Sequence, residues 1–239
     1  MRKVFLFCML IPVLGISQTK NVVNTNRVFA KSDKVLEFEK ALASHTQKYH
    51  TGDWKWRVYA ISSGPDAGGY LIAEGPVSWE QIDGRGNLGT EHNTDWNKMV
   101  AIYITDRGSS GYGVYNDSLS TVAIGDYSSH INITHFIQKI GYGDEVFDML
   151  KKLKPVWVEG AQSIAVYAAS SSGPASYTVV TRYKNGLKER AAGYRKPFKQ
   201  RYEAIHGEDS FDDYTFSLRN YIQETWSELL EYRADLSSK

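Results

Sequence analysis

Cysteine is almost absent from this chain of 239 residues: its single cysteine, Cys8, lies inside an apolar N-terminal run. That run follows Arg2 and Lys3, covers residues 4–16 and ends in small residues, which is the pattern of a secretory signal peptide cut before Gln18. We therefore expect residues 1–17 to be removed and the product to be secreted or periplasmic. A mature chain without cysteine has no disulfide and depends on its hydrophobic core.

An excess of charge of either sign is also lacking. The chain has 28 Lys and Arg against 27 Asp and Glu, and removal of Arg2 and Lys3 leaves 26 basic residues. Binding to a nucleic acid rests on accumulated positive charge, so we expect no nucleic-acid partner. Beyond residue 17, no apolar stretch approaches the ~20 residues of a membrane span, so we expect no membrane insertion after signal removal.

Motifs of nucleophilic, phosphate-binding or metal chemistry are missing as well. There is no Gly-x-Ser-x-Gly elbow, and "GRGNLG" from Gly84 lacks the Lys-Ser/Thr ending of a phosphate loop. His45 and His50 are five apart, a spacing that directs them to different sides of one helix, and His92 lies in a polar loop. His135 is on a strand with no neighbouring carboxylate. We therefore predict no metal site and no cofactor.

The chain does contain an internal repeat. "VYAISSGP" begins at Val58 and "VYAASSSGP" begins at Val166, 108 residues later, and each precedes an apolar run that starts with a tyrosine. A second pair of similar segments follows in the same order: "YNDSLS" from Tyr115 and "YRADLS" from Tyr232. Repeated segments in the same order predict a duplicated structural unit.

Each half is expected to run strand, helix, strand, strand, helix. In the first half the expected elements are a strand at 27–30, a helix at 35–49 capped by Ser32 or Asp33, strands at 54–61 and 70–73, and a short helix at 79–82 capped by Ser78. In the second they are a strand at 130–139, a helix from 143 shortened or kinked by Pro155, strands at 163–169 and 177–183, and helices from 187. The apolar stripe at 218–229 is expected to be helical, and the Gly/Ser-rich segment 106–113 to be a flexible loop.

This order is that of the split βαβ, or ferredoxin-like, unit, whose sheet has one bare face. Two units can cover each other's bare faces within one chain. We therefore predict an α+β fold with a loose lead-in at 18–25, a first ferredoxin-like repeat at 26–128 and a second at 129–239. The halves should form one cooperative unit, a monomer that is an intramolecular pseudo-dimer.

The capped helix followed by "WKWRVYAISSGP" and "GGYLIAEGPVSW" resembles the dimeric α/β-barrel superfamily, which includes NIPSNAP-like and monooxygenase-like proteins. The resemblance covers residues 25–237 and implies two tandem repeats packed as a pseudo-dimeric α/β barrel. Members of this superfamily include cofactor-independent oxygenases, haem-degrading enzymes, chlorite-processing haem enzymes and proteins with no known activity. The resemblance therefore implies a fold more closely than an activity.

Candidate ligand-binding residues follow from strand alternation. Arg57 and Tyr59 share the more polar face of their strand, and Tyr167 is the repeat counterpart of Tyr59. We expect these three residues near a cavity between the sheets, with Tyr70 and Tyr177 as neighbours. Arginine can hold an anion and tyrosine hydroxyls can orient a substrate or donate a proton. The difference between Trp56-Arg57 and Ile164-Ala165 predicts a site nearer the first half.

Three functions remain open on these grounds. The favoured one is a small-ligand-binding or non-catalytic scaffold, in which Trp and Tyr fill the cavity. The alternative is a cofactor-independent monooxygenase-like enzyme acting on a small aromatic substrate, which requires an open apolar pocket with a few polar groups. A third is haem binding, with His135 as the axial ligand.

Overall fold

The computed structural model describes residues 19–171 and 173–239, so the predicted signal peptide lies outside the described residues. The helices and strands are, in chain order, β1 (Val22–Ala30), α1 (Val35–Tyr49), β2 (Trp56–Ile61), β3 (Tyr70–Val77), α2 (Trp79–Gly84), α3 (Gly89–Asp95), β4 (Ile104–Tyr115), β5 (His130–Gln138), α4 (Gly143–Glu159), β6 (Ser163–Ala169), β7 (Ser176–Arg182), α5 (Phe198–His206), α6 (Ser210–Tyr221) and β8 (Ile222–Tyr232). No helix in this part of the chain is long and apolar enough to cross a bilayer.

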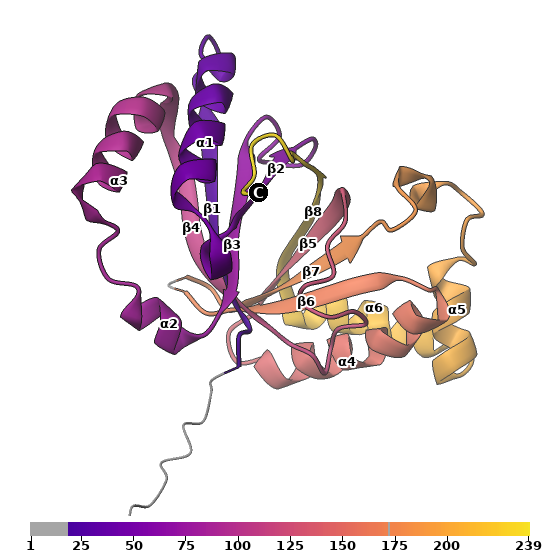
Figure 1. Cartoon of the computed structure of the whole chain (residues 1–239). Coiled ribbons are helices and arrows are strands. Elements are labelled where there is room, and N and C mark those ends of the chain that lie inside the picture. Colours follow the sequence, from indigo (N-terminus) through magenta and orange to yellow (C-terminus); the bar gives the residue numbers. More distant parts are fainter. Residues whose placement is uncertain (1–18, 172) are drawn as a thin grey trace, which may run out of the picture.

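The eight strands close into one barrel with the order β1-β3-β2-β8-β5-β7-β6-β4, and every neighbouring pair is antiparallel. Helices α1 to α3 lie outside the strands of the first half, and α4 to α6 lie outside those of the second (Figure 1). The predicted α+β class and the closed barrel are confirmed. Closure pairs every strand on both sides, so no sheet edge is left open.

Both halves have the same strand order, β4-β1-β3-β2 in the first and β8-β5-β7-β6 in the second. The halves join at two seams, β2 with β8 and β4 with β6. Each seam is short: Tyr59–Ile61 faces Leu230–Tyr232, and Gly113–Tyr115 faces Tyr167–Ala169.

Three hydrophobic clusters hold this arrangement together. One lies between α1 and the first sheet around Phe38 and Leu42, and another between α4 and the second sheet around Leu150 and Val156. The third lies inside the barrel and includes Tyr59, with residues of both halves. The helices bury one face each because their apolar residues recur every three to four positions.

Each half also closes the core of the other. After β4, Leu119 is buried in the cluster of the second half and the Ser120 hydroxyl accepts a hydrogen bond from the Val166 N–H at 2.9 Å. After β8, Leu236 is buried in the first cluster and the Ser237 hydroxyl accepts one from the Val58 N–H, also at 2.9 Å. These leucines and serines belong to the similar segments "YNDSLS" and "YRADLS" of the sequence. Each segment completes the core of the opposite half.

Three segments differ from the sequence-based expectations. Strand β1 begins at Val22, so the end of the expected lead-in at 18–25 is paired in the sheet. The expected loop 106–113 lies within β4. A small residue fits this strand where it passes a large side chain, since a Cβ on Gly113 would lie 3.3 Å from the Tyr167 Cβ. The expected helical stripe 218–229 changes to strand at Ile222, since β8 is required to seal the barrel between β2 and β5.

Two helix details also differ. Helix α4 continues through Pro155 to Glu159, so the proline does not shorten it. Helix α1 has no side-chain cap from Ser32 or Asp33, and Lys34 occupies the capping position. The cap of α2 is as expected: Ser78 and Gln81 form a reciprocal capping box.

Candidate functional site

A cavity of about 230 Å³ lies inside the barrel and is lined by residues of both halves. Its wall is mainly apolar, formed by Val23, Leu71, Ala73, Ile131, Ile133 and Val180. These side chains alternate along their strands with outward residues that pack against the helices. The interior is therefore an open apolar pocket and not a core filled by Trp and Tyr.

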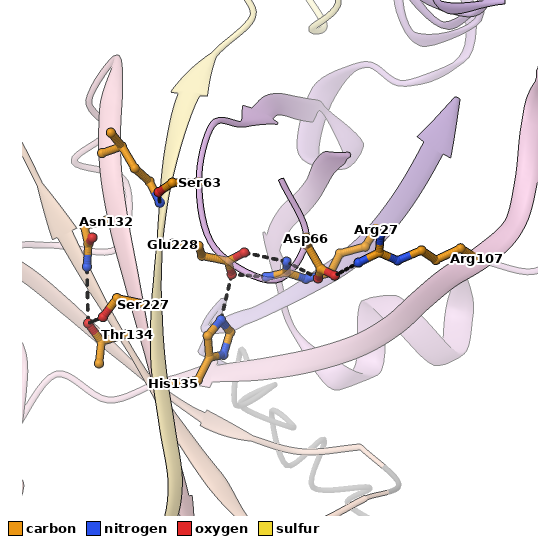
Figure 2. Close-up of polar contacts among 10 residues, drawn as sticks. Arg27, Ser63, Asp66, Arg107, Asn132, Thr134, His135, Ser227 and Glu228 are labelled. Atoms are coloured by element: carbon orange, nitrogen blue, oxygen red, sulfur yellow. Dashed lines mark hydrogen bonds and ion pairs between the residues drawn. The ribbon is translucent and has the colours of Figure 1, made fainter. Parts of the chain in front are cut away.

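At one end of the cavity, Glu228 of β8 is fully buried and binds the side chains of Arg27 and His135 (Figure 2). Arg27 of β1 holds it with both terminal nitrogens, with Nη1 2.8 Å from Oε2. The Nε2 of His135 lies 2.7 Å from Oε1 of the same carboxylate. Burial opposes ionisation of Glu228, but the hydrogen bonds from Arg27 and His135 outweigh it and lower its pKa to about 2.

The network continues through the β2–β3 turn. Arg27 Nη1 also donates to Asp66 at 2.7 Å, and Asp66 accepts from Arg107 of β4 at 2.6 Å (Figure 2). Although burial acts against its charge, the contacts with Glu228 and Asp66 raise the pKa of Arg27. Two carboxylates and two guanidiniums from four segments thus compensate one another at this end of the barrel.

Within this network, Arg27 and His135 both line the cavity, and His135 is the one that can accept a proton. Its ring is stacked on Trp226, with centroids 4.6 Å apart and planes at 20°. Because the carboxylate of Glu228 accepts from Nε2, that nitrogen carries the proton and Nδ1 keeps its lone pair. Among the described residues no hydrogen bond uses this Nδ1. The arrangement is that of a histidine oriented by a carboxylate to accept a proton.

The other end of the cavity is cationic. Arg182 of β7 is 3% exposed and lines the cavity. It donates to main-chain carbonyls of Ala123, Ile124 and Asp126 and to the Tyr167 hydroxyl at 3.2 Å. In the part of the chain that the structure describes, Arg182 has no carboxylate within ion-pair distance. A buried guanidinium without a counter-charge is costly, and an anionic ligand would compensate it.

Tyr127 connects Arg182 to the predicted residue Arg57. The Arg57 guanidinium lies 3.8 Å from the centre of the Tyr127 ring, and that of Arg182 lies 5.4 Å from it. Arg57 also donates to the Gly75 carbonyl at 2.7 Å. Burial raises the pKa of Tyr127, so its hydroxyl is a neutral hydrogen-bond donor at pH 7.

Of the residues selected from the sequence, Tyr59 and Tyr167 line the cavity. Burial raises the pKa of each to about 12, which keeps both phenols neutral. Arg57 does not line the cavity itself but contacts the ring of Tyr127, which does. The structure thus brings these three residues to the inner face of the barrel.

Tyr70 and Tyr177 are not where the sequence analysis expected them. Tyr70 lies opposite Ala60 and packs on Phe38 of α1, with its hydroxyl on Glu39 at 2.7 Å. Tyr177 lies opposite Ala168 and packs against the helices of the second half. Residues that face each other on antiparallel strands share a face, so both tyrosines are one position out of phase with Tyr59 and Tyr167.

Arg27, Arg182 and Glu228 were not among the residues expected at a site, and His135 was expected only as a haem ligand. One signal was available: the 108-residue offset that relates Tyr59 to Tyr167 also relates Arg27 to His135. Glu228 was hidden because its segment was read as a helix. Nothing in the sequence around Arg182 marks it as a binding residue. It is recognised only from its contacts in the folded chain, which include no carboxylate among the described residues.

The structure also brings together His45, His50 and His92, which the sequence analysis treated as unrelated. Helix α1 ends at Tyr49, so His50 leaves the helical path and its ring turns back toward His45. The assumption that both lie on one helix, facing different directions, was wrong for this reason.

No protein-family model and no curated protein sequence matches this chain. Solved structures do match. A "putative monooxygenase" from Fusobacterium nucleatum superposes with a TM-score of 0.55 at 12% identity, covering 88% of this chain and 91% of the other. An anthrone oxidase-like protein gives 0.53 at 15% identity over 90% and 92%.

A mutant chlorite dismutase from Candidatus Nitrospira defluvii gives a TM-score of 0.52 at 5% identity over 92% of this chain and 94% of the other. At such identities the similarity concerns the fold alone. Together with the closed antiparallel barrel, these matches show a dimeric α+β barrel fold.

Proposed function

We propose that the barrel interior binds a small organic anion whose apolar body lies in the cavity and whose negative group pairs with Arg182. The observation that carries this proposal is a buried guanidinium that faces an apolar cavity and has no carboxylate partner among residues 19–171 and 173–239. The neutral hydroxyls of Tyr167 and Tyr127 add donors for the same anionic group.

The size of the cavity limits the ligand. A cavity of about 150 Å³ suffices for benzene, and the present one measures about 230 Å³. A molecule of about two fused rings is therefore the expected size. Arg182 of β7 lies opposite Ile131 of β5, and His135 lies four residues further along β5. At about 3.3 Å per residue, the backbone positions of Arg182 and His135 are about 13 Å apart along the strands.

Binding is tested with naphthalene-2-carboxylate and its neutral analogue naphthalene-2-carboxamide, by calorimetry on the full chain. A charged hydrogen bond contributes about 1.5–3 kcal/mol, so we expect the carboxylate to bind about tenfold or more tightly than the amide. Arg182→Gln should remove this preference, whereas Arg190→Gln, which removes a charge outside the cavity, should keep it. Equal binding of both compounds to the unmodified chain would refute the anion site.

A cavity-filling variant separates the pocket from the charge. Ala73 lines the cavity, and Ala73→Leu places three more carbon atoms in it while leaving Arg182 in place. Both compounds should then lose affinity. If Ala73→Leu binds them as before, the ligand lies elsewhere.

A second candidate function is cofactor-independent oxygenation of such a ligand, with His135 as the base. His135 lines the cavity with a lone pair on Nδ1 and is oriented by Glu228, as a general base requires. Abstraction of a proton from an activated CH2 group would give a carbanion that reacts with O2, converting CH2 and O2 to C=O and H2O. The names of the anthrone oxidase-like and monooxygenase-type structural neighbours favour this candidate over a non-catalytic scaffold.

The proton-abstraction step is measurable by itself. Two-ring carbon acids such as 2-indanone should exchange their acidic hydrogens for deuterium faster with the protein than without it, as seen by NMR. His135→Gln should abolish the acceleration and His206→Gln should not. Oxygen uptake by an electrode then tests the second step; exchange that is unaffected by His135→Gln would exclude this role.

Haem, which the resemblance implied for some relatives, does not fit the barrel interior. The Nε2 of His135 is engaged by Glu228, and the cavity accommodates about two rings where a porphyrin has four pyrroles.

We further propose that the chain is a tandem duplication, with units at 26–128 and 129–239. The shared strand order and the reciprocal "YNDSLS" and "YRADLS" segments favour this origin. We also propose export as a monomeric pseudo-dimer after removal of residues 1–17. N-terminal sequencing of the secreted or periplasmic product should give Gln18 first, and light scattering should give the mass of one chain.

A further inference from the structure

A group of three histidines lies outside the barrel, on the far side of the first sheet from the cavity. His45 is in α1, His50 follows it directly, and His92 is in α3. One ring nitrogen from each lies within 4.8 Å of those of the other two. His45 and His50 are each 1% exposed and His92 is half-buried.

The protons on these rings are located by their neighbours. Asp95 Oδ2 lies 2.8 Å from Nδ1 of His45, and Glu74 Oε2 lies 3.3 Å from Nδ1 of His50. The side-chain oxygen of Asn93 lies 3.1 Å from Nδ1 of His92. An oxygen acceptor beside Nδ1 favours the tautomer protonated there, and that tautomer has its lone pair on Nε2.

These lone pairs converge. The Nε2 atoms of His45 and His50 are 3.4 Å apart. Among the described residues the Nε2 of His92 is buried and has no hydrogen-bond partner. Two nitrogens bound to one tetrahedral zinc ion at 2.0–2.1 Å lie about 3.3 Å apart. The observed separation therefore suits a shared cation.

The surroundings hold the rings of this cluster in place. The ring of His50 is stacked on Trp56 at 3.5 Å, which fixes its orientation. Glu74 is itself anchored by the Trp56 Nε1 at 2.7 Å and by Arg85.

The geometry points to a zinc-type divalent metal site in which His45, His50 and His92 bind the ion through Nε2. Carboxylates on the distal nitrogens of metal-binding histidines are the usual second layer of such sites, and Asp95 and Glu74 supply it here. Three imidazoles suit Zn²⁺, Cu²⁺ or Ni²⁺ better than Mg²⁺ or Ca²⁺. The ion would connect α1, α3 and, through Glu74, β3, and it would leave one coordination position for water.

This site is independent of the proposed ligand cavity. Trp56 and Glu74 face each other on the outer side of β2 and β3, whereas Arg57 and Ala73 face each other on the inner side. Loss of the metal should therefore leave binding of naphthalene-2-carboxylate intact.

The test uses the full chain without a polyhistidine tag, freed of metal by a chelator and then titrated with Co²⁺. We expect one ion per chain, with the intense visible bands of tetrahedral Co²⁺, displaced by one equivalent of Zn²⁺. Zn²⁺ should also raise the melting temperature.

His92→Ala should weaken Zn²⁺ binding about tenfold or more and abolish the tetrahedral bands, since it removes a direct ligand; His206→Ala, a histidine outside the cluster, should change neither. Asp95→Asn should also weaken Zn²⁺ binding about tenfold. If Asp95 only packed against its neighbours, the substitution would leave Zn²⁺ affinity unchanged. Circular dichroism checks that the variants are folded. A chain that takes up no stoichiometric Co²⁺, that shows only the weak bands of octahedral Co²⁺, or that binds equally after His92→Ala would overturn the proposal.

Discussion

Glu228 is the residue on which the charged end of the barrel depends. Its carboxylate is completely buried and is compensated by Arg27 and His135, while Asp66 pairs with Arg27 and Arg107. Removing one partner of a buried ion pair costs about 3–5 kcal/mol, because the remaining charge stays buried. The sequence gives no warning of this dependence, since Glu228 lies in an ordinary acidic–aromatic segment.

We predict that Glu228→Gln lowers the free energy of unfolding by about 3 kcal/mol or more. The amide cannot compensate Arg27, whose only other carboxylate partner among the described residues is Asp66. Glu224→Gln, an exposed position on the same strand, should change it by less than about 0.5 kcal/mol. Urea denaturation measures both, and equal effects of the two substitutions would contradict the prediction.

The pH dependence of stability follows from the same residue. The pKa of Glu228 is lowered from 4.5 to about 2 in the folded chain, so its contribution is complete above pH 4.5 and is lost as pH falls toward 2. The loss should amount to about 3 kcal/mol at 1.36 kcal/mol per pKa unit. The free energy of unfolding, measured between pH 5 and 2, should show this decline. In the Glu228→Gln chain the total decline over this pH range should be smaller by that amount, so its slope should be shallower. An unchanged slope would mean that other carboxylates account for the acid sensitivity.

Among the elements, the two "Ser-Gly-Pro" turns have similar sequences and different surroundings. Gly64 and Gly173 both have positive φ angles, of 96° and 135°. A Cβ on Gly64 would lie 2.8 Å from the Glu228 Cβ and 3.0 Å from the Ser227 carbonyl oxygen, whereas one on Gly173 meets nothing within 4 Å. The first turn therefore packs directly on β8.

We predict that Gly64→Ala lowers the free energy of unfolding by at least about 2 kcal/mol more than Gly173→Ala does. Both substitutions incur backbone strain, and only the first also collides with main-chain atoms. Thermal denaturation of the two variants gives the comparison directly. Equal losses would show that the turn at Gly64 can move away from β8.

Elements with strong periodicity were predictable and those defined by the barrel were not. The α1 helix and the strands around the repeated motif follow local patterns that the structure keeps. The β4 and β8 segments do not: Gly and Ser in β4 favour loops, and the Leu218–Leu229 spacing favours a helix. Both are strands because closing the barrel supplies hydrogen bonds on two sides, which outweighs local propensity.

At the scale of the whole molecule, the halves are linked by more than the two short seams. Leu119 follows β4 of the first half and is buried in the core of the second, and Leu236 follows β8 of the second half and is buried in the core of the first. Each half therefore lacks part of its core without the other.

We predict a single unfolding transition for the described barrel, and we predict that Leu119→Ala and Leu236→Ala each destabilise both halves. The expected loss is about 2–5 kcal/mol for each buried leucine. Hydrogen–deuterium exchange of peptides from each half checks this, because a cooperative molecule shows the same decrease in protection on both sides. Protection lost in only one of the two halves would indicate separately folding units.

The sequence alone determined the repeated order of elements, the α+β class and the inward face of Arg57, Tyr59 and Tyr167, because these depend on local periodicity and on direct repetition. The tertiary structure alone decided which charges meet. Arg27, Asp66, Glu228 and His135 come from four segments, and the three histidines come from two, so their contacts exist only after the strands have closed and α1 has ended at Tyr49. Distances between residues far apart in the chain are set by packing, and a single sequence has no periodicity that encodes them.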